Sequence, residues 1–367
     1  MSQETLDIIE FDGRTFAEAE QLPIPEWHCS RTERLQPTLT LKEDDLFLIT
    51  DTIGNINCHN EQVDASLGFF CKDTRFLNRL ELQIEGHAPI LLSSTAQQGF
   101  ALSVLCSNPY FPDHLKAETI GIQRDIVLQG ALFEELTITN YNTDPVQFQI
   151  SLSFNADFAD LFQIRGRKRS QVGHLMRQVL PQKANGHNIQ SLVEETGELI
   201  LAYQGLDEAL MESRIQFSHQ LPSSFQGYTA LWDLSLNAHE TQKIGYRLQP
   251  MLSNKPASVV SAPMTLKQAH GSEVNEQQQW QKEITHIRTD NRALNQIIER
   301  AEKDIYLLGQ TSGEGKILSA GIPWFATLFG RDSIISAWQT LILDSSIARQ
   351  PLLALAEYQG QVDDPWR

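Results

Sequence analysis

The sequence predicts a multidomain protein with β-structure first and α-structure after it, an antiparallel β-sandwich followed by helices. Two observations predict this order. Apolar and polar residues alternate with period two in many short stretches between about residues 41 and 250, and from about residue 290 the apolar residues recur with helical spacing. Gly, Pro, Asn and Asp separate the first set of stretches, as expected for antiparallel sheets that stack on each other.

Changes in composition predict the domain boundaries. Residues 1–40 lack periodicity and form an irregular leader, and residues 41–250 form the β-sandwich. Residues 251–270 form a linker, because three prolines fall between positions 250 and 265. Residues 271–367 then begin a helical domain.

The clearest strand runs from Val146 to Phe154, where apolar residues alternate with Gln and Ser. This pattern places one face of the strand in a core and the other toward a polar surface. The same pattern predicts strands at 46–50, 80–84, 119–128, 132–139, 198–204, 213–218, 229–236 and 242–249.

Three helices are predicted after the linker. The first covers Asn291–Leu308, with Asp290 as its cap and Gly309 as its end. The second begins near Asp332, and the third spans about 346–359. The second helix is predicted to bury Ile334, Ile335, Ala337, Trp338, Leu341 and Ile342.

Net charge and cysteine usage exclude several classes of function. Lys and Arg number 29 against 46 Asp and Glu, which gives a net charge of −17. Such a surface repels nucleic acids and anionic membranes but is indifferent to a neutral sugar. Cys29, Cys58, Cys71 and Cys106 lack metal-ligand spacing, so no metal or cofactor is expected. No signal peptide or membrane span is visible, so the protein is expected in the cytoplasm with reduced thiols.

The stretch Gly321–Trp338 carries the residues best suited to chemistry. Trp324 and Phe325 offer aromatic surfaces on which sugar rings can stack, and Arg331 and Asp332 stand at the start of a helix. A carboxyl group beside aromatic rings is suited to the role of general acid in the cleavage of a glycosidic bond. The alternative is structural. Asp332 would then cap a helix that begins at Ser333, and Trp324 and Phe329 would pack in a core against the first helix.

A second charged stretch follows the strongest strand. Asp157 and Asp160 are followed by Arg165, Arg167 and a further Lys–Arg pair. The acids balance the bases, so nucleic-acid binding is not indicated. The interpretation is a solvated loop or a cluster of ion pairs at a domain interface.

Several motifs occur together in one order. They are DTRFLNRLELQIEG at 73–86, LLSS at 91–94, NP at 108–109, FNADFADLFQIRGRKR at 154–169, AGIPWFATLFGRDS at 320–333 and LALAEYQG at 353–360. In this order they resemble bacterial amylo-alpha-1,6-glucosidase-like proteins, which are glycogen-debranching glycoside hydrolases. The resemblance covers roughly residues 40–367. It implies a supersandwich-like β-domain followed by the first helices of an (α/α)6 toroid.

The resemblance also implies roles for individual residues. Asp332 falls on the catalytic acid of the family, and Trp324, Phe325 and Arg331 fall on positions that contact the sugar. Hydrolysis of a glycoside requires two carboxyl groups. The family's second carboxylate lies beyond Arg367, so the catalytic domain is expected to be truncated and the chain inactive or incomplete.

The expected ligand is an α-glucan such as glycogen or a maltooligosaccharide, cleaved by acid/base hydrolysis without a cofactor. Two alternatives remain open. The chain can be a non-catalytic glucan-binding or scaffolding protein, or a related toroid glycosidase that acts on another α-glycoside.

Overall fold

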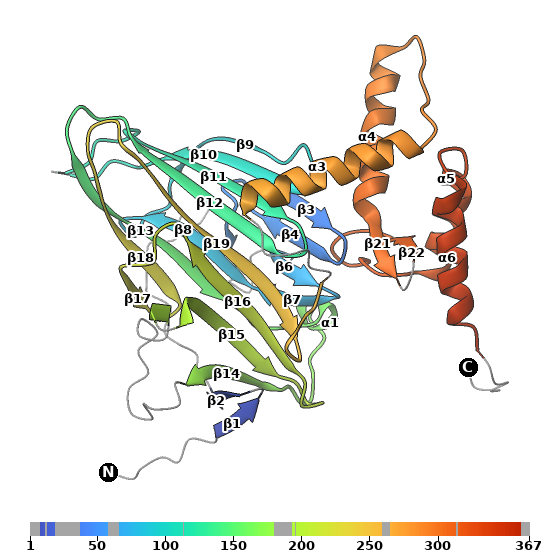
Figure 1. Cartoon of the computed structure of the whole chain (residues 1–367), viewed down its shortest axis with the longest axis horizontal. Coiled ribbons are helices and arrows are strands. Elements are labelled where there is room, and N and C mark those ends of the chain that lie inside the picture. Colours follow the sequence, from blue (N-terminus) through green and yellow to red (C-terminus); the bar gives the residue numbers. More distant parts are fainter. Residues whose placement is uncertain are drawn as a thin grey trace.

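A computed structural model shows a large β-domain joined to a smaller group of helices (Figure 1). It describes residues 8–11, 13–18, 37–57, 66–112, 114–179, 193–194, 196–258, 265–312 and 315–360. Cys29 and Cys58 lie outside the described residues, whereas Cys71 and Cys106 are buried free thiols, as predicted.

The largest sheet of the β-domain has eleven strands, all paired antiparallel. Its spatial order is β1 (Ile8–Phe11), β2 (Arg14–Glu18), β14 (His174–Val179), β15 (Glu198–Gln204), β16 (Leu210–Ser218), β19 (Thr241–Leu252), β12 (Leu132–Asn140), β11 (Ile120–Leu128), β10 (Ala101–Ser107) and β9 (Ile90–Thr95), with β20 (Lys255–Pro256) beside β19.

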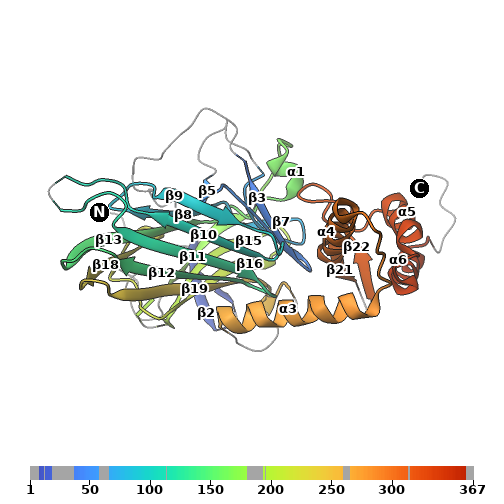
Figure 2. The same ribbon diagram turned by 90° about the horizontal axis from the view of Figure 1, so that it is seen from above.

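Two smaller antiparallel sheets complete the β-domain. The five-stranded sheet has the order β17 (Ser224–Gln226), β18 (Thr229–Leu236), β13 (Val146–Asn155), β8 (Arg79–Ile84) and β5 (Ile56–Asn57). The four-stranded sheet has the order β3 (Leu39–Glu43), β4 (Leu46–Thr50), β6 (Gly68–Cys71) and β7 (Thr74–Leu77). The stacked sheets in Figure 2 confirm the predicted antiparallel β-sandwich.

One core fills the space between the sheets. On β13, Phe148, Ile150 and Leu152 point into it, as the alternating pattern predicted. From the eleven-stranded sheet, Ile122 of β11 and Leu136 of β12 enter the same core. The period-two pattern therefore identified the buried faces of both layers.

A buried polar network lies within this core. The guanidinium of Arg124 on β11 is fully buried, and its Nε donates to Glu134 Oε1 at 2.5 Å. Its Nη1 donates to Asn55 Oδ1 at 2.6 Å, and the same oxygen accepts from the Leu82 amide at 3.0 Å. Tyr246 donates to Glu134 Oε2 at 2.5 Å. Since Leu82 belongs to β8, the network joins the two facing sheets.

The prediction of an irregular leader over residues 1–40 is wrong in part. Strands β1 and β2 form a hairpin, and β2 pairs with β14 at the edge of the eleven-stranded sheet. Phe16 is buried with Met176 and Ile200 in a small separate cluster. The short strands offered too few residues for the alternation to be recognised.

The prediction of a linker over residues 251–270 is also wrong at both ends. Strand β19 continues to Leu252 and pairs with β20, and helix α3 covers Leu266–Glu283. Thr265 and Gln268 form a capping box that starts this helix. Only Ala269 and Glu273 of α3 are buried, so the helix lacks the apolar stripe by which sequence reasoning recognises helices.

Helix α3 fixes the helical group to the β-domain. Ala269 is buried against Phe133 on β12 and Phe100, while Val274 packs at the edge of that cluster. Leu307 of helix α4 (Arg292–Leu308) reaches the same cluster. A Cβ added to Gly99 would come within 2.1 Å of Leu307 Cδ1, so the two residues are in close contact. The two domains are thus packed directly against each other.

The remaining helices differ from the prediction in their caps. Asn291, rather than Asp290, caps α4, although Gly309 ends it as expected. Helix α5 begins at Gly330 and ends at Thr340, and α6 covers Ser345–Glu357. A short hairpin of β21 (Gly309–Ser312) and β22 (Gly315–Leu318) separates α4 from α5.

The apolar residues predicted to be buried on the second helix are exposed, with one exception. Only Ala337 is buried, and Trp338 has 73% of its surface exposed. The other four are exposed as well: Ile334, Ile335, Leu341 and Ile342. The predicted period was correct, but none of the described residues covers this face.

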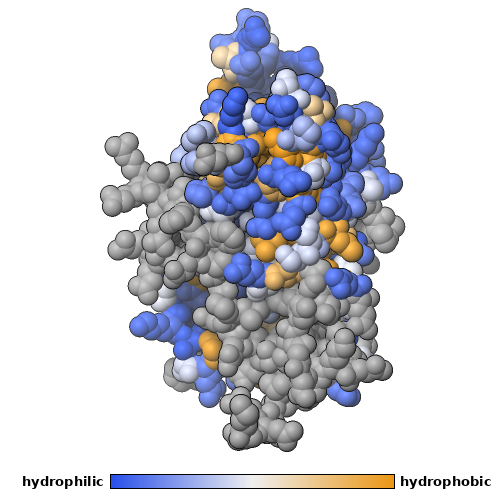
Figure 3. All heavy atoms as spheres, turned by 90° about the vertical axis from the view of Figure 1, so that its left-hand side faces the viewer, coloured by the Kyte–Doolittle hydropathy of each residue, from blue (hydrophilic) through white to orange (hydrophobic). Residues whose placement is uncertain are grey.

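At the end of the β-domain away from the helices, Figure 3 shows hydrophilic side chains with apolar areas between them. Scattered apolar side chains are normal on a protein surface. Twelve large apolar side chains between Leu294 and Tyr358 are exposed, more than on the much longer β-domain among the described residues.

Candidate functional site

The segment between β22 and α5 is folded into a closed turn. The amides of Gly321 and Phe325 each donate to the other's carbonyl oxygen, at 3.1 and 3.0 Å. The peptide bond between Ile322 and Pro323 is cis. This turn leads directly to Gly330, the first residue of α5.

The turn is packed on the core of the β-domain. Ala326 is buried within the main core, and Ile322 and Trp324 pack against it as partly buried residues. The β-domain therefore positions the turn, although the turn belongs to the helical part of the sequence. Trp324 is partly buried in this position.

Aromatic surface remains open beside this anchored turn. Phe325 is 45% exposed, and its ring meets that of Phe329 at 5.5 Å between centroids in a T-shaped arrangement. The structural alternative of core packing concerned Trp324 and Phe329; Trp324 is partly buried against the core of the β-domain, and Phe329 is exposed. Exposed aromatic faces on a fixed turn are suited to binding the apolar faces of a sugar.

A guanidinium from the β-domain lies over the same rings. Arg165 follows the short helix α1 (Leu161–Ile164), and its Cζ is 5.9 Å from the centroid of Trp324 and 6.0 Å from that of Phe325. Both separations are within the range of cation–π attraction. Figures 1 and 2 place α1 on the side of the β-domain that faces the helices.

The charged stretch around Arg165 is exposed from Arg165 to Ser170, and its ion pairs join residues of the β-domain. Asp157 pairs with Arg75 at 2.5 Å, and Asp160 caps α1 and pairs with Arg169. Sequence reasoning named Arg165 only as a member of this stretch. No local signal could reveal its contact with rings about 160 positions away.

Asp332 lies in the first turn of α5 and is not its cap. The cap position belongs to Phe329, which makes no capping hydrogen bond through its side chain. The capping alternative for Asp332 is therefore wrong. A carboxylate in the first turn still interacts favourably with the helix dipole.

The side chains of Arg331 and Asp332 are both exposed. Neither makes a hydrogen bond or ion pair with the residues that the structure describes. The structure thus brings Trp324 and Phe325 together with Arg165, and places Arg331 and Asp332 at the start of the helix that follows. Both charged groups are available to a ligand.

Residues 41–247 match the sequence model of one protein family, described as the N-terminal domain of some glycogen debranching enzymes. The match covers more than half of the 367 residues and extends from β3 into β19. The chain belongs to this family. The β-sandwich is the debranching-enzyme N-terminal domain, and the turn at Gly321–Ala326 follows it in sequence and packs on it.

Solved structures are similar only at a distance. A provisionally named kojibiose phosphorylase from the human microbiome has a TM-score of 0.35 and 8% identity, and the match covers 74% of this chain and 36% of that one. A provisionally named aldose 1-epimerase from Escherichia coli K12 has a TM-score of 0.31 and 8% identity, covering 59% and 99%. The Slr1438 protein from Synechocystis sp. PCC 6803 has a TM-score of 0.30 and 11% identity, covering 63% and 95%.

This chain spans little more than a third of the length of that phosphorylase. No curated protein matches the sequence. In the part of the chain that the structure describes, no helix is long and apolar enough to cross a membrane. The same residues include no group of three or more His, Cys, Asp or Glu side chains arranged to hold a metal ion.

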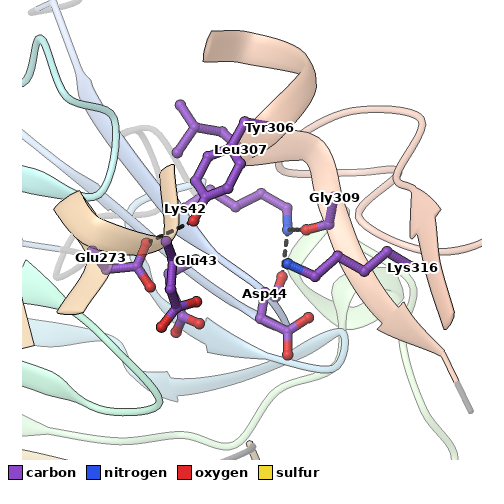
Figure 4. Close-up of a pocket in the computed structure, with 9 residues that line it drawn as sticks. Lys42, Glu43, Asp44, Glu273, Tyr306, Leu307, Gly309 and Lys316 are labelled. Atoms are coloured by element: carbon purple, nitrogen blue, oxygen red, sulfur yellow. Dashed lines mark hydrogen bonds between the residues drawn. The ribbon is translucent and has the colours of Figure 1, made fainter. Parts of the chain in front are cut away.

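A small polar hollow opens where the debranching-enzyme N-terminal domain meets the helices (Figure 4). Its lining residues are Lys42, Glu43, Asp44, Glu273, Glu276, Tyr306, Leu307, Gly309 and Lys316. Lys42 Nζ reaches the Gly309 carbonyl at 3.5 Å, and Tyr306 donates to Glu273 at the same distance. The hollow lies at the junction of the two domains. None of the predicted site residues lines it, namely Trp324, Phe325, Arg331 and Asp332.

Burial shifts the pKa values of three groups in the hollow. It raises the pKa of Glu43 to about 7, with Asp44 and Glu276 adding to the shift and the Gly130 amide opposing it. Burial, with Glu43 and Glu276, raises the pKa of Glu273 to about 8. Burial also lowers the pKa of Lys42 to about 8 against the attraction of Asp44.

These shifts predict a stability that depends on pH. The pKa values of Glu43 and Glu273 are raised above their ordinary value of 4.5, so the folded state holds protons that the unfolded state releases. The free energy of unfolding should therefore fall as the pH rises from about 4.5 to about 8. The pKa of Lys42 is lowered, so its effect on stability runs in the opposite direction. From this group, the free energy of unfolding should fall as the pH falls from 10.5 to about 8.

Glu273→Gln is expected to weaken the dependence at acidic to neutral pH, because glutamine does not titrate. The measurement is the free energy of unfolding in urea at about pH 5 and about pH 8. Glu283→Gln is the control, since Glu283 is exposed on the same helix. If both variants keep the pH dependence of the unaltered protein, Glu273 is not a source of it.

Proposed function

We propose that the protein is a glycoside hydrolase of the amylo-alpha-1,6-glucosidase, glycogen-debranching type. It acts on branches of α-glucans by acid/base hydrolysis. The membership of residues 41–247 in the debranching-enzyme N-terminal family is the observation that carries the proposal. The turn that presents Trp324 and Phe325 supports it, because Trp324 packs on that same domain while the ring of Phe325 stays exposed.

The residues of the site have separate roles in this proposal. Trp324 and Phe325 stack on a glucosyl ring, Arg331 donates hydrogen bonds to its hydroxyl groups, and Asp332 gives a proton to the leaving oxygen. Asp332 must hold its proton until the bond breaks, which requires a dry, apolar setting. Ile335 and Trp338, on the same helix, are also exposed.

Further helices would complete this setting. We infer that α4, α5 and α6 are the first helices of an (α/α)6 toroid. Helix faces as apolar as that of α5 are stable in water when another element covers them. Covering Trp338 and Ile334 would at the same time enclose Asp332.

Hydrolysis needs a second carboxyl group opposite the first. The family resemblance places it later in the helical domain than Arg367. Residues 1–367 by themselves are therefore expected to bind α-glucan and to hydrolyse it no faster than background. Glu357, the last residue of α6, is exposed, and Asp363 and Asp364 lie outside the described residues.

A non-catalytic role as a glucan-binding protein is the second candidate. The anchored aromatic turn favours it, because sugar binding at this turn needs no second carboxylate. Both candidates predict the same ligand and differ in turnover. Action on another α-glycoside by a related toroid would change only the preferred sugar.

The chain is expected to bind neutral α-glucans with almost no dependence on salt, because no phosphate charges are neutralised in the complex. The measurement is a calorimetric titration with maltoheptaose at about 0.05 M and about 0.5 M salt, in parallel with duplex DNA. DNA should give no binding, given the net charge of −17. Tight, salt-sensitive DNA binding would refute the proposal, and so would an absence of any interaction with maltoheptaose.

A further inference from the structure

We propose that Arg165 of the β-domain is a sugar-binding residue, so that the substrate site is shared between the two domains. The inference rests on the proposed function and adds a residue from the debranching-enzyme N-terminal domain that the predicted site does not include. Its basis is the position of the Arg165 guanidinium over the rings of Trp324 and Phe325.

The hydrogen-bond donors of Arg165 are available. Among the described residues its guanidinium forms no ion pair, since the two acids nearest in sequence are engaged elsewhere. Asp157 is held by Arg75, and Asp160 is held by Arg169. Arg165 is exposed, and its side chain takes part in no hydrogen bond with the described residues. Its N–H donors are therefore free to bind a ligand beside the exposed ring of Phe325.

The chemistry of this arrangement fits a neutral sugar. The aromatic rings offer a surface for C–H groups, and the guanidinium offers parallel N–H donors for two adjacent hydroxyl oxygens of the same ring. Because Phe325 is exposed and Arg165 is exposed, a ligand can reach both groups together. A glucosyl unit at this point would contact the β-domain and the helical domain at once.

The alternative is a latch between domains that does not touch the ligand. Arg165→Met separates the two roles. Methionine is unbranched and packs well against aromatic rings, so it preserves much of the contact, but it has no N–H donors. Arg167→Met is the matched control. Arg167 is an exposed residue two positions after Arg165, and its substitution removes the same charge.

The experiment is a calorimetric titration of the full chain with maltoheptaose, with thermal unfolding of each variant measured in parallel. Arg165→Met is expected to raise Kd about tenfold or more, as for the loss of hydrogen bonds from a charged donor, and to leave the unfolding temperature close to that of Arg167→Met. Arg165→Lys should recover little affinity, because an ammonium group has no flat face or paired donors.

Two results would overturn the proposal. In the first, Arg165→Met binds maltoheptaose as tightly as Arg167→Met. In the second, Arg165→Met lowers the unfolding temperature but leaves Kd unchanged, which is the behaviour of a latch. If the unaltered chain does not bind maltoheptaose at all, the proposed function itself fails and the inference fails with it.

Discussion

Arg124→Ala is expected to lower the free energy of unfolding by about 3–5 kcal/mol, the largest loss of stability that a single substitution in the described core should cause. The substitution leaves Glu134 fully buried without its cation. It also removes the guanidinium group that donates to Asn55 Oδ1 and to the Ile53 carbonyl oxygen. A buried carboxylate that loses its partner must either remain charged in a dry core or take up a proton. Both outcomes cost free energy.

The measurement is equilibrium unfolding in urea, followed by far-ultraviolet circular dichroism of the whole chain. The double variant Arg124→Met/Glu134→Met is the control, because apolar residues of similar size can replace a buried ion pair at little cost. It should recover most of the stability that Arg124→Ala loses. A loss below about 1 kcal/mol for Arg124→Ala would mean that water reaches Glu134 in this core.

Much of the β-domain could be predicted from the sequence because apolar and polar residues alternate along many of its strands. Strands β4, β15 and β18 have the predicted bounds, and the other predicted strands differ by a few residues at most. Alternation failed where the strands were short, as in β1 and β2. It also could not show that Arg124, a charged residue on β11, points into the core.

The helical part was harder because helices are recognised by an apolar stripe. Helix α3 is polar over most of its length and was missed, although its capping residues Thr265 and Gln268 were visible. Helix α5 has the expected stripe, but sequence periodicity cannot tell whether an apolar face has a partner. Trp338 and Ile342 are exposed because none of the described residues covers them, which the periodicity could not reveal.

The candidate site could be predicted only in its sequence-local part. Trp324, Phe325, Arg331 and Asp332 lie within nine positions, and a family resemblance identified them together. Arg165 could not be linked to them, because its contact depends on the packing of the Gly321–Ala326 turn against a distant domain. The hollow around Lys42, Glu43 and Glu273 escaped notice for the same reason.

The role of Asp332 can be tested in a hybrid protein, in which this chain is joined to the later helices of the catalytic domain of a glycogen debranching enzyme. Such a hybrid supplies the second carboxyl group that hydrolysis requires. Asp332→Asn keeps the size of the side chain but cannot donate a carboxyl proton. Asp344→Asn is the matched control, since Asp344 caps α6 and asparagine caps a helix about as well as aspartate.

The decisive measurement is kcat for the hydrolysis of glycogen limit dextrin by the hybrid, with and without Asp332→Asn. A general acid contributes about 10²- to 10⁴-fold to a rate, so Asp332→Asn should lower kcat by about that factor with an unchanged unfolding temperature. Asp344→Asn should leave kcat unchanged. If the hybrid hydrolyses the substrate and Asp332→Asn is as active as Asp344→Asn, Asp332 is not the acid and the proposed catalytic site is wrong.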